Sequence, residues 1–394
     1  MQKETKPMNN FTYHVPTNIH FGQGMISHLS EMSESGSKVL LIYGGGSIKR
    51  NGIYDQVLKI CEESKITIFE LSGVEPNPRI DTVRKGVQIC KEESIDMVLA
   101  VGGGSTIDCA KVVAAGAKYD GDAWDLVIDS SLLKDALPIY TVLTMAATGS
   151  EMDGIAVISN PDIPYKKGTR AQCLKPKMSI LDPTYTYTVS KRQSSAGVID
   201  MMSHVLENYF TNVDGAYLQA RYCEGLLQTI IQYGPVVLEN PTDYNARANL
   251  MWTASQAING ILSSGAEVSW SCHPMEHELS AYYDITHGEG LGILTPVWME
   301  YVLSENTVSK FYEYGVNVWH LNAKDKPMKV AQEAIKCTKH FIFDVMGCPK
   351  TLKDVGIIDD RAFEAMAESA AKGCKYSYVP LTKEDIVKIY KQAL

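Results

Sequence analysis

Residues 97–117 read MVLAVGGGSTIDCAKVVAAGA, and this stretch decides the fold class. Its first five residues are an apolar run typical of a buried strand, and the segment from Thr106 to about Ala117 is typical of a helix. The glycines between them permit a tight turn whose backbone N–H groups can approach an anion at the start of the helix. The stretch therefore predicts a strand, a phosphate-binding loop and a helix. A tight structural turn is the alternative interpretation of the glycines.

The same alternation continues on both sides of this stretch. It predicts strands at 38–43, 65–71 and 138–144 and helices at 53–63 and 79–93. Alternation of this kind indicates an α/β domain with a doubly wound, parallel, Rossmann-like sheet. The carboxyl ends of its strands, and with them the glycine loops, are then expected along one edge.

The pattern changes after residue 154. Two strand-like segments, 154–159 and 177–182, flank a basic, turn-rich segment and are interpreted as a hairpin beside the main sheet. From about Ser190 onward only helices are expected, at 194–210, 216–232, 245–262, 297–303, 308–319, 330–346 and 359–372. We therefore expect an α/β domain over 1–185 and an all-helical domain over 186–394.

Composition excludes several classes of protein. The 394 residues suffice for two domains, and the formal charge of -9 argues against nucleic acid or an anionic membrane as a partner. No apolar run reaches the ~18 residues of a membrane span, and the polar N-terminus lacks a secretory signal. The nine cysteines include no CxxC and do not form a disulfide framework. A cytoplasmic location is expected.

Two further polar turns follow expected strands. The first contains Gly44, Gly45, Gly46 and Ser47 and continues into Lys49 and Arg50. A carboxylate in this region would favour the unphosphorylated ribose of NAD(H), whereas a serine and two cations suit the 2′-phosphate of NADP(H). The alternative is that both cations are merely solvated. The second turn, 144–151, is rich in small residues and hydroxyls. Three such turns at one sheet edge predict a dinucleotide site.

The other half of the chain carries closely spaced histidines. His273 and His277 are four residues apart and share a helical face, and His287 follows ten residues later. Asp200 and His204 have the same four-residue spacing. Asp200, His204, His273 and His287 together make an Asp/His₃ set, which suits Zn²⁺ or Fe²⁺ better than Ca²⁺ or Mg²⁺. The set could close a structural site, but beside a nucleotide a catalytic ion is favoured.

These motifs resemble the iron-containing (group III) alcohol dehydrogenases, above all their NADPH-dependent aldehyde reductase and butanol dehydrogenase branch. The resemblance runs over nearly the whole chain. It rests on NFTYHVPTNIHFGQG (10–24), GGGSTIDCAK (102–111), TMAATGSE (144–151), LDPTYTYTVSKRQSSAGVIDMMSHVLE (181–207) and HELSAYYDITHG (277–288). It implies a dehydroquinate synthase-like architecture with the active site between the α/β domain and the helical, metal-binding domain. It also implies a homodimer or a larger homo-oligomer.

The resemblance also implies roles for single residues. The family's metal ligands fall on the Asp/His₃ set, and its non-ligand active-site histidine falls on His277. A lysine near the nicotinamide falls on Lys167, or else on Lys166. The asparagine that follows TGSE by two residues is Asp153 here, a carboxylate expected near the nicotinamide. The remaining cofactor contacts fall on Gly102, Gly103, Gly104, Ser105, Asp108, Thr144 and Thr148.

The expected reaction is reversible hydride transfer between NADP(H), with NAD(H) as the alternative, and small aldehydes or primary alcohols. One Fe²⁺ or Zn²⁺ would polarise the carbonyl, and water or His277 would supply the proton. A dehydroquinate synthase-like lyase needs a cluster of cations for its substrate, and the segment from Trp270 to Gly290 contains no Lys or Arg. A non-catalytic binding protein that keeps the fold is disfavoured because all four ligands are present.

Overall fold

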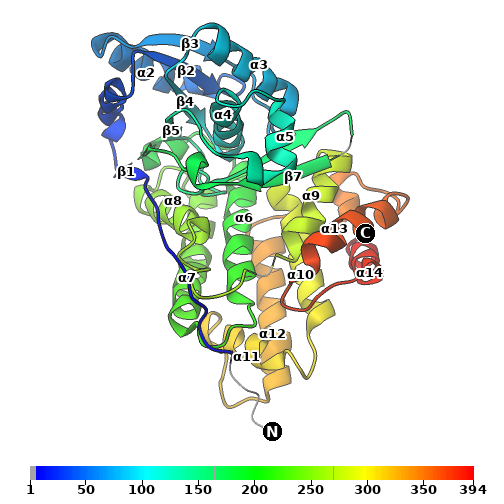
Figure 1. The fold of residues 1–394 in the computed structure, drawn as a ribbon. Coiled ribbons are helices and arrows are strands. Elements are labelled where there is room, and N and C mark those ends of the chain that lie inside the picture. The colour runs from blue at the N-terminus through cyan, green and yellow to red at the C-terminus, as the bar shows by residue number, and fades with distance from the viewer. Residues whose placement is uncertain (1–5, 164, 269) are drawn as a thin grey trace. The chain divides into compact units, whose positions relative to one another are not determined.

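The computed structural model describes residues 6–163, 165–268 and 270–394. They form two compact units, neither of which is continuous in sequence (Figure 1). The α/β unit combines His14–Val189 with Pro241–Asn259. The helical unit combines the segment that ends at Tyr13 with Ser190–Asn240 and Gly260–Leu394. The segment that ends at Tyr13 and the segment Pro241–Asn259 thus belong to a different unit from the residues next to them in sequence.

A parallel sheet forms the centre of the α/β unit. Within the described residues its strand order is β1-β8-β5-β4-β2-β3, and every neighbouring pair is parallel. In the register of β2 and β4, Leu99 lies beside Leu41. The strand order and the parallel pairing confirm the expected doubly wound sheet. The strands are β1 (Asn18–Phe21), β2 (Lys38–Tyr43), β3 (Thr67–Leu71), β4 (Met97–Gly102), β5 (Ile139–Leu143) and β8 (Met178–Leu181).

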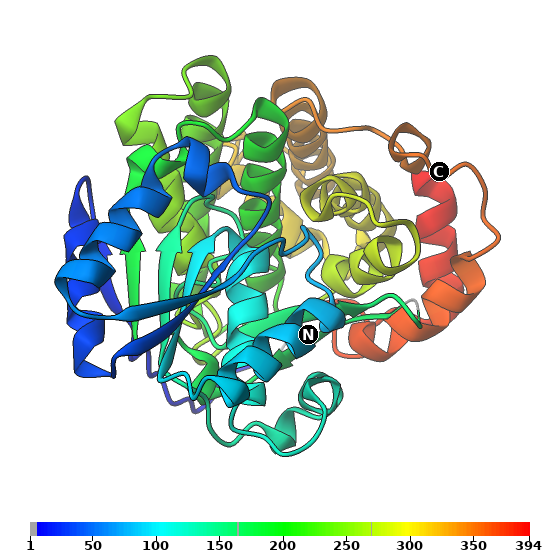
Figure 2. The same cartoon turned by 90° about the horizontal axis from the view of Figure 1, so that it is seen from above.

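Alternate side chains of the strands enter two separate hydrophobic cores. Leu40 and Val98 belong to the core that contains α3 (Ile80–Glu92) and α4 (Gly104–Gly116). Val39 and Leu99 belong to the core that contains the 3₁₀ helix η1 (Met25–Glu34) and α2 (Ile53–Glu63). Figure 2 shows η1 and α2, in blue, on the opposite side of the strands from α3. Both faces are therefore covered, which explains the continuous apolar runs of β2 and β4.

A hairpin is present, but the prediction of its second strand is wrong. β6 (Ile155–Asn160) pairs antiparallel with β7 (Tyr165–Arg170), which lies in the basic segment expected to be a turn. The other expected strand is β8, and it pairs with β1 and β5 in the main sheet. β7 has polar residues at its buried positions, so an apolar alternation could not reveal it.

The helices expected beyond residue 190 are present, although their ends differ. α10 begins at His287 rather than at 297, because its glycines and Pro296 hide the helical signal. The helical unit contains α6 (Lys191–Tyr209), α7 (Tyr217–Glu239), α9 (Cys272–Tyr283), α10 (His287–Val302), α11 (Val308–Asn317), α12 (Pro327–Lys339), α13 (Phe363–Cys374) and α14 (Lys383–Ala393). α8 (Tyr244–Ile258) belongs to the α/β unit. No described helix has the length and hydropathy of a membrane span.

Candidate active site

The glycine loops lie at the carboxyl ends of neighbouring strands in the α/β unit. The chain passes from β2 to β3 at one edge of the sheet, whereas it passes from β4 to β5 in the opposite direction. Such a reversal leaves a crevice outside the strand ends, where nucleotides bind in open α/β sheets. The loop at 44–47 follows β2, the loop at 102–105 follows β4, and residues 144–151 follow β5.

The glycines of these loops differ in their surroundings. A Cβ on Gly102 would collide with the side chain of Thr106, and one on Gly104 would collide with Thr148. These two positions therefore need glycine for packing. A Cβ on Gly45 would meet no atom within 4 Å, so the backbone of the loop after β2 has open space for a ligand.

Ser105 and Asp108 are both engaged within the α/β unit. The Ser105 hydroxyl donates to the Pro76 carbonyl. The Asp108 carboxylate accepts the Ser150 hydroxyl at 2.6 Å and the Val157 N–H at 2.9 Å, and burial raises its pKa to about 6. Asp108 thus fastens β6 to α4. Its contact with a cofactor, like that of Ser105, stays a prediction.

Asp153 belongs to a buried ion pair. Its Oδ1 lies 2.7 Å from Nζ of Lys111, which also donates to the Ser150 hydroxyl and to the Ile155 carbonyl. Lys111 is completely buried, and an unpaired buried ammonium is very costly. Asp153 therefore balances the charge of Lys111, and its expected position beside the nicotinamide stays a prediction.

Thr144, Thr148 and Lys167 are partly exposed. The Thr144 N–H donates to the Gly102 carbonyl at 3.0 Å, which holds the loop after β5 against the loop after β4. On β7, Nζ of Lys167 donates to the Ile128 carbonyl at 2.6 Å. Contacts of all three residues with a cofactor stay predictions.

A carboxylate lies beside the loop that follows β2. Oε2 of Glu70 on β3 lies 3.8 Å from Nζ of Lys49, and the hydroxyls of Tyr43 and Tyr54 each donate to the carboxylate at 2.5 Å. Partial burial opposes ionisation, but the two hydroxyls and Lys49 hold the pKa of Glu70 below its usual range. One of the two cations expected to bind a 2′-phosphate is therefore partly neutralised.

In the helical unit, the four predicted metal ligands converge. Oδ1 of Asp200 lies 3.5 Å from Nδ1 of His204 and 3.8 Å from Nε2 of both His273 and His287. Asp200 and His204 lie one turn apart on α6, as their spacing indicates. His273 is in the first turn of α9, and His287 begins α10.

Three of these groups contain buried polar atoms that form no hydrogen bond within the described residues. They are Oδ1 of Asp200, Nδ1 of His204 and Nε2 of His273. One such atom costs about 1–3 kcal/mol, so three at one point call for a ligand. An oxygen and imidazole nitrogens are donors for Fe²⁺ or Zn²⁺. The residues fit a divalent cation, and their role as its ligands stays a prediction.

The same groups have strongly shifted pKa values. Burial lowers the pKa of His204 to about 4. Burial would raise the pKa of Asp200, but the neighbouring imidazoles outweigh it and lower the pKa to about 2. Burial would lower the pKa of His273, but the carboxylates of Glu207 and Asp200 raise it to about 10. A cation must therefore displace a proton from His273.

Glu207, which the sequence interpretation misses, positions His273. Its Oε2 contacts Nδ1 of the ring, while Oε1 accepts the backbone N–H groups of 271–273 at 2.5–3.2 Å. One carboxylate thus caps α9 and orients Nε2 of His273 toward Asp200. The signal in the sequence is the i, i+4, i+7 spacing of Asp200, His204 and Glu207 on one face of α6.

Glu276 has the same relation to His287. This fully buried carboxylate contacts Nδ1 of His287 through Oε2 and accepts the Ser280 hydroxyl through Oε1. A Cβ on Gly290 would lie 2.8 Å from Cγ of Glu276. Glycine at this position therefore lets α10 approach the carboxylate that orients its first histidine.

His277 lies beside the predicted ligands. Its ring centroid is 6.1 Å from that of His273 and 5.6 Å from that of His287, and the residue is partly exposed. The ring of Trp270 packs edge-on against His273 with 4.9 Å between centroids. A side chain in this position can contact a substrate or transfer a proton. The catalytic role of His277 stays a prediction.

Comparison with known proteins gives matches over both units. Residues 16–183 match the model of the iron-containing alcohol dehydrogenases, and 194–394 match the C-terminal model of that family. The NADH-dependent butanol dehydrogenase A of Clostridium acetobutylicum is 53% identical over 390 residues, 98% of this chain and 100% of that protein. The NADPH-dependent aldehyde reductase YqhD of Escherichia coli is 38% identical over 89% of this chain and 90% of its own. A crystal structure of NADH-dependent butanol dehydrogenase A from Thermotoga maritima superposes with a TM-score of 0.93 at 39% identity, and the match covers 98% and 99% of the two chains.

A parallel sheet with glycine loops at its strand ends, together with a donor set that suits a divalent cation, is the combination expected of a metal-dependent dehydrogenase. The chain belongs to the iron-containing alcohol dehydrogenase family and is an oxidoreductase of alcohols and aldehydes. This family uses a nicotinamide dinucleotide and a divalent metal, and the resemblance drawn from the motifs is confirmed. The lyase and the non-catalytic binding protein are not favoured.

Proposed function

We propose that the chain transfers a hydride reversibly between NADH and small aldehydes or primary alcohols. One Fe²⁺ or Zn²⁺ would be held by Asp200, His204, His273 and His287. When bound, the cation supplies Lewis-acid polarisation of the carbonyl oxygen. The observation that carries the proposal is that Oδ1 of Asp200, Nδ1 of His204 and Nε2 of His273 are buried close together without a hydrogen bond within the described residues.

The chain's own residues prepare this site. Glu207 and Glu276 bind Nδ1 of His273 and His287, so that Nε2 of each ring faces Asp200. Such partners fix ring orientation and raise the basicity of a ligand. His277, one turn beyond His273 on α9, is the residue that we propose passes a proton to the alcohol oxygen or positions the substrate.

The His273→Ala variant tests the metal assignment. Turnover of butanal should be lost, while nucleotide binding, measured by fluorescence titration, should stay near the wild-type value. The exposed His340 gives the matched control, and His340→Ala should keep full activity. Near-native activity of His273→Ala with the metal still bound would show the assignment to be wrong. Net oxidation of NADH with butanal separates a dehydrogenase from a lyase that regenerates its nucleotide.

The preference for NADH departs from the expectation of NADPH. It is supported by the Glu70 carboxylate beside Lys49, and two relatives at 53% and 52% identity are named NADH-dependent. Glu70→Gln should move the ratio of kcat/KM values toward NADPH, because Lys49 would then be free to attract a 2′-phosphate. A wild-type enzyme that prefers NADPH about tenfold, a difference of about 1.4 kcal/mol, would contradict the proposal.

We also propose that the protein is cytoplasmic, in line with the free thiols of all nine cysteines, and that it forms a homodimer or a larger assembly. Light scattering of the purified enzyme measures the assembly, and a monomer at micromolar concentration would contradict it.

A further inference from the structure

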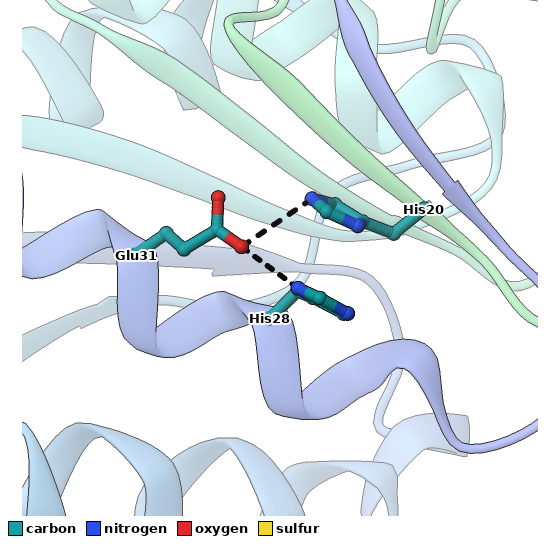
Figure 3. A group of neighbouring side chains, drawn as sticks. All are labelled: His20, His28 and Glu31. Atoms are coloured by element: carbon teal, nitrogen blue, oxygen red, sulfur yellow. Dashed lines mark hydrogen bonds and ion pairs between the residues drawn. The ribbon is translucent and has the colours of Figure 1, made fainter.

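A second group of metal-binding side chains lies in the α/β unit. Figure 3 shows that His20, His28 and Glu31 point toward one another, His20 from β1 and the other two from η1. Oε1 of Glu31 is 2.7 Å from Nδ1 of His28 and 3.6 Å from Nε2 of His20. One donor atom from each residue lies within 4.8 Å of the other two.

The local backbone holds these residues together. His28 and Glu31 are three residues apart on a 3₁₀ helix, where three residues complete one turn and such side chains align. The chain turns from β1 into η1 at Gly24, which has φ +79, and the Gly24 N–H donates to the Asp182 carboxylate at 2.8 Å. His20 is thereby placed opposite the first turns of η1.

The side chains are packed but accessible. The rings of His20 and His28 stack with 3.8 Å between centroids and 13° between planes. The side chains of His20, His28 and Glu31 are 15%, 40% and 42% exposed, so that an ion can enter from solvent. Nδ2 of Asn18 lies 3.3 Å from Nε2 of His20, so the amide donates to the lone pair of this nitrogen, and a cation bound at Nε2 would replace that hydrogen bond.

We propose that His20, His28 and Glu31 form a peripheral site for a borderline divalent cation such as Zn²⁺, with water completing the coordination. Two imidazole nitrogens and one carboxylate oxygen suit Zn²⁺ or Ni²⁺, whereas Mg²⁺ prefers oxygen ligands. Zinc bonds of ~2.0–2.1 Å place tetrahedral donor atoms roughly 3.3 Å apart. The separations of Oε1 of Glu31 from Nδ1 of His28 and from Nε2 of His20, 2.7 and 3.6 Å, bracket that value. To bind one ion, the stacked rings would rotate so that their lone pairs point toward a common centre.

The bound cation would join two elements that are sequential in the chain. β1 is an edge strand of the sheet, and η1 packs together with α2 in the hydrophobic core on one face of the sheet. A cation held between them would stabilise the α/β unit without taking part in hydride transfer, because a ligand that binds only the folded state raises its stability.

Calorimetric titration of the metal-loaded enzyme with Zn²⁺ tests this site. The wild type should take up one Zn²⁺ per chain beyond the catalytic metal, and its Tm should rise. His20→Ala combined with His28→Ala should take up none while turnover stays unchanged. The single variant His28→Gln keeps the size of the side chain and should weaken binding even if the double variant folds poorly.

Two controls make the result specific. His340 also lies beside a carboxylate, with Nδ1 3.1 Å from Asp344, and His340→Ala should keep the additional uptake. Mg²⁺ at the same concentration should give neither heat nor a rise in Tm. The proposal is wrong if the wild type takes up no additional Zn²⁺, if His28→Gln binds Zn²⁺ as tightly as the wild type, or if Mg²⁺ replaces Zn²⁺ equally well.

Discussion

The Gly290→Ala substitution tests how the packing of the helical unit shapes the candidate metal site. The added Cβ would lie 2.8 Å from Cγ of Glu276 and 3.0 Å from Cδ1 of Ile285. Glu276 cannot swing aside, because it is fully buried and contacts both Ser280 and His287. Overpacking costs about 1–3 kcal/mol, and alanine recovers about 0.5–1 kcal/mol over glycine within a helix. The free energy of unfolding should therefore fall, by up to about 2.5 kcal/mol.

The same substitution should reach the metal through His287. Loss of a carboxylate that orients a ligand lowers metal affinity about 10–100-fold, which competition with a chelator measures. Gly225→Ala in α7 is the matched control, because its Cβ would meet no atom within 4 Å. The free energy of unfolding of this variant, measured in urea, should rise by about 0.5–1 kcal/mol, and its metal affinity should equal that of the wild type.

Equal behaviour of the two variants in both assays would refute the reasoning. A double variant tests the route of the effect: Gly290→Ala added to Glu276→Gln should lower metal affinity no further than Glu276→Gln alone, because coupled residues are not additive.

Three further predictions concern buried charges. Zinc affinity should rise about tenfold per pH unit from pH 7 to 9, because His273, with a pKa of about 10, is protonated below that pH and must lose its proton to bind metal. Chelator competition at several pH values measures this slope, and a flat profile would contradict the proton displacement. Glu207→Gln should flatten the profile and lower the free energy of unfolding by about 1–3 kcal/mol, because a charged acceptor for three backbone N–H groups is lost. The control is Glu278→Gln, which replaces a buried carboxyl near Ser369 and Lys372. Its unfolding in urea measures the general effect of such a replacement on packing, and it should leave the pH profile of zinc affinity unchanged. Asp153→Asn should cost about 3 kcal/mol because it leaves Lys111 without its charge partner, whereas Asp162→Asn on the exposed turn should change the unfolding midpoint little. An unchanged midpoint for Asp153→Asn would show that Asp108 alone balances Lys111.

Much of the fold can be predicted from the sequence because burial on both faces leaves a plain pattern. The inner strands β2, β4 and β5 are almost entirely apolar, with Lys38 at the start of β2 and Thr141 within β5 as the exceptions. β7 cannot be predicted in this way, because Lys166 and Thr169 occupy its buried positions. The hydroxyl of Thr169 donates to the Leu126 carbonyl at 2.7 Å, a partner that only the fold supplies.

The candidate site is predictable to the extent that it depends on local spacing. Asp200 and His204 are neighbours because four residues make about one helical turn. The relation between Glu207 and His273 joins two helices, and a helical glutamate is usually a solvated residue, so the sequence alone does not reveal it. Likewise, Lys49 can be counted as a free cation only until the folded sheet brings Glu70 beside it.

The segment Pro241–Asn259 has a consequence for synthesis of the chain. It contains α8, whose Ser255 hydroxyl donates to the buried Glu151 carboxylate and whose Met251 joins the core under the sheet. A ribosome delivers every strand of the sheet, and then α6 and α7, before it delivers α8. Domains generally fold as units during synthesis, from the N-terminus onward. The α/β unit therefore cannot complete its core until α6 and α7 of the other unit have been synthesised. Neither unit corresponds to one continuous stretch of the gene.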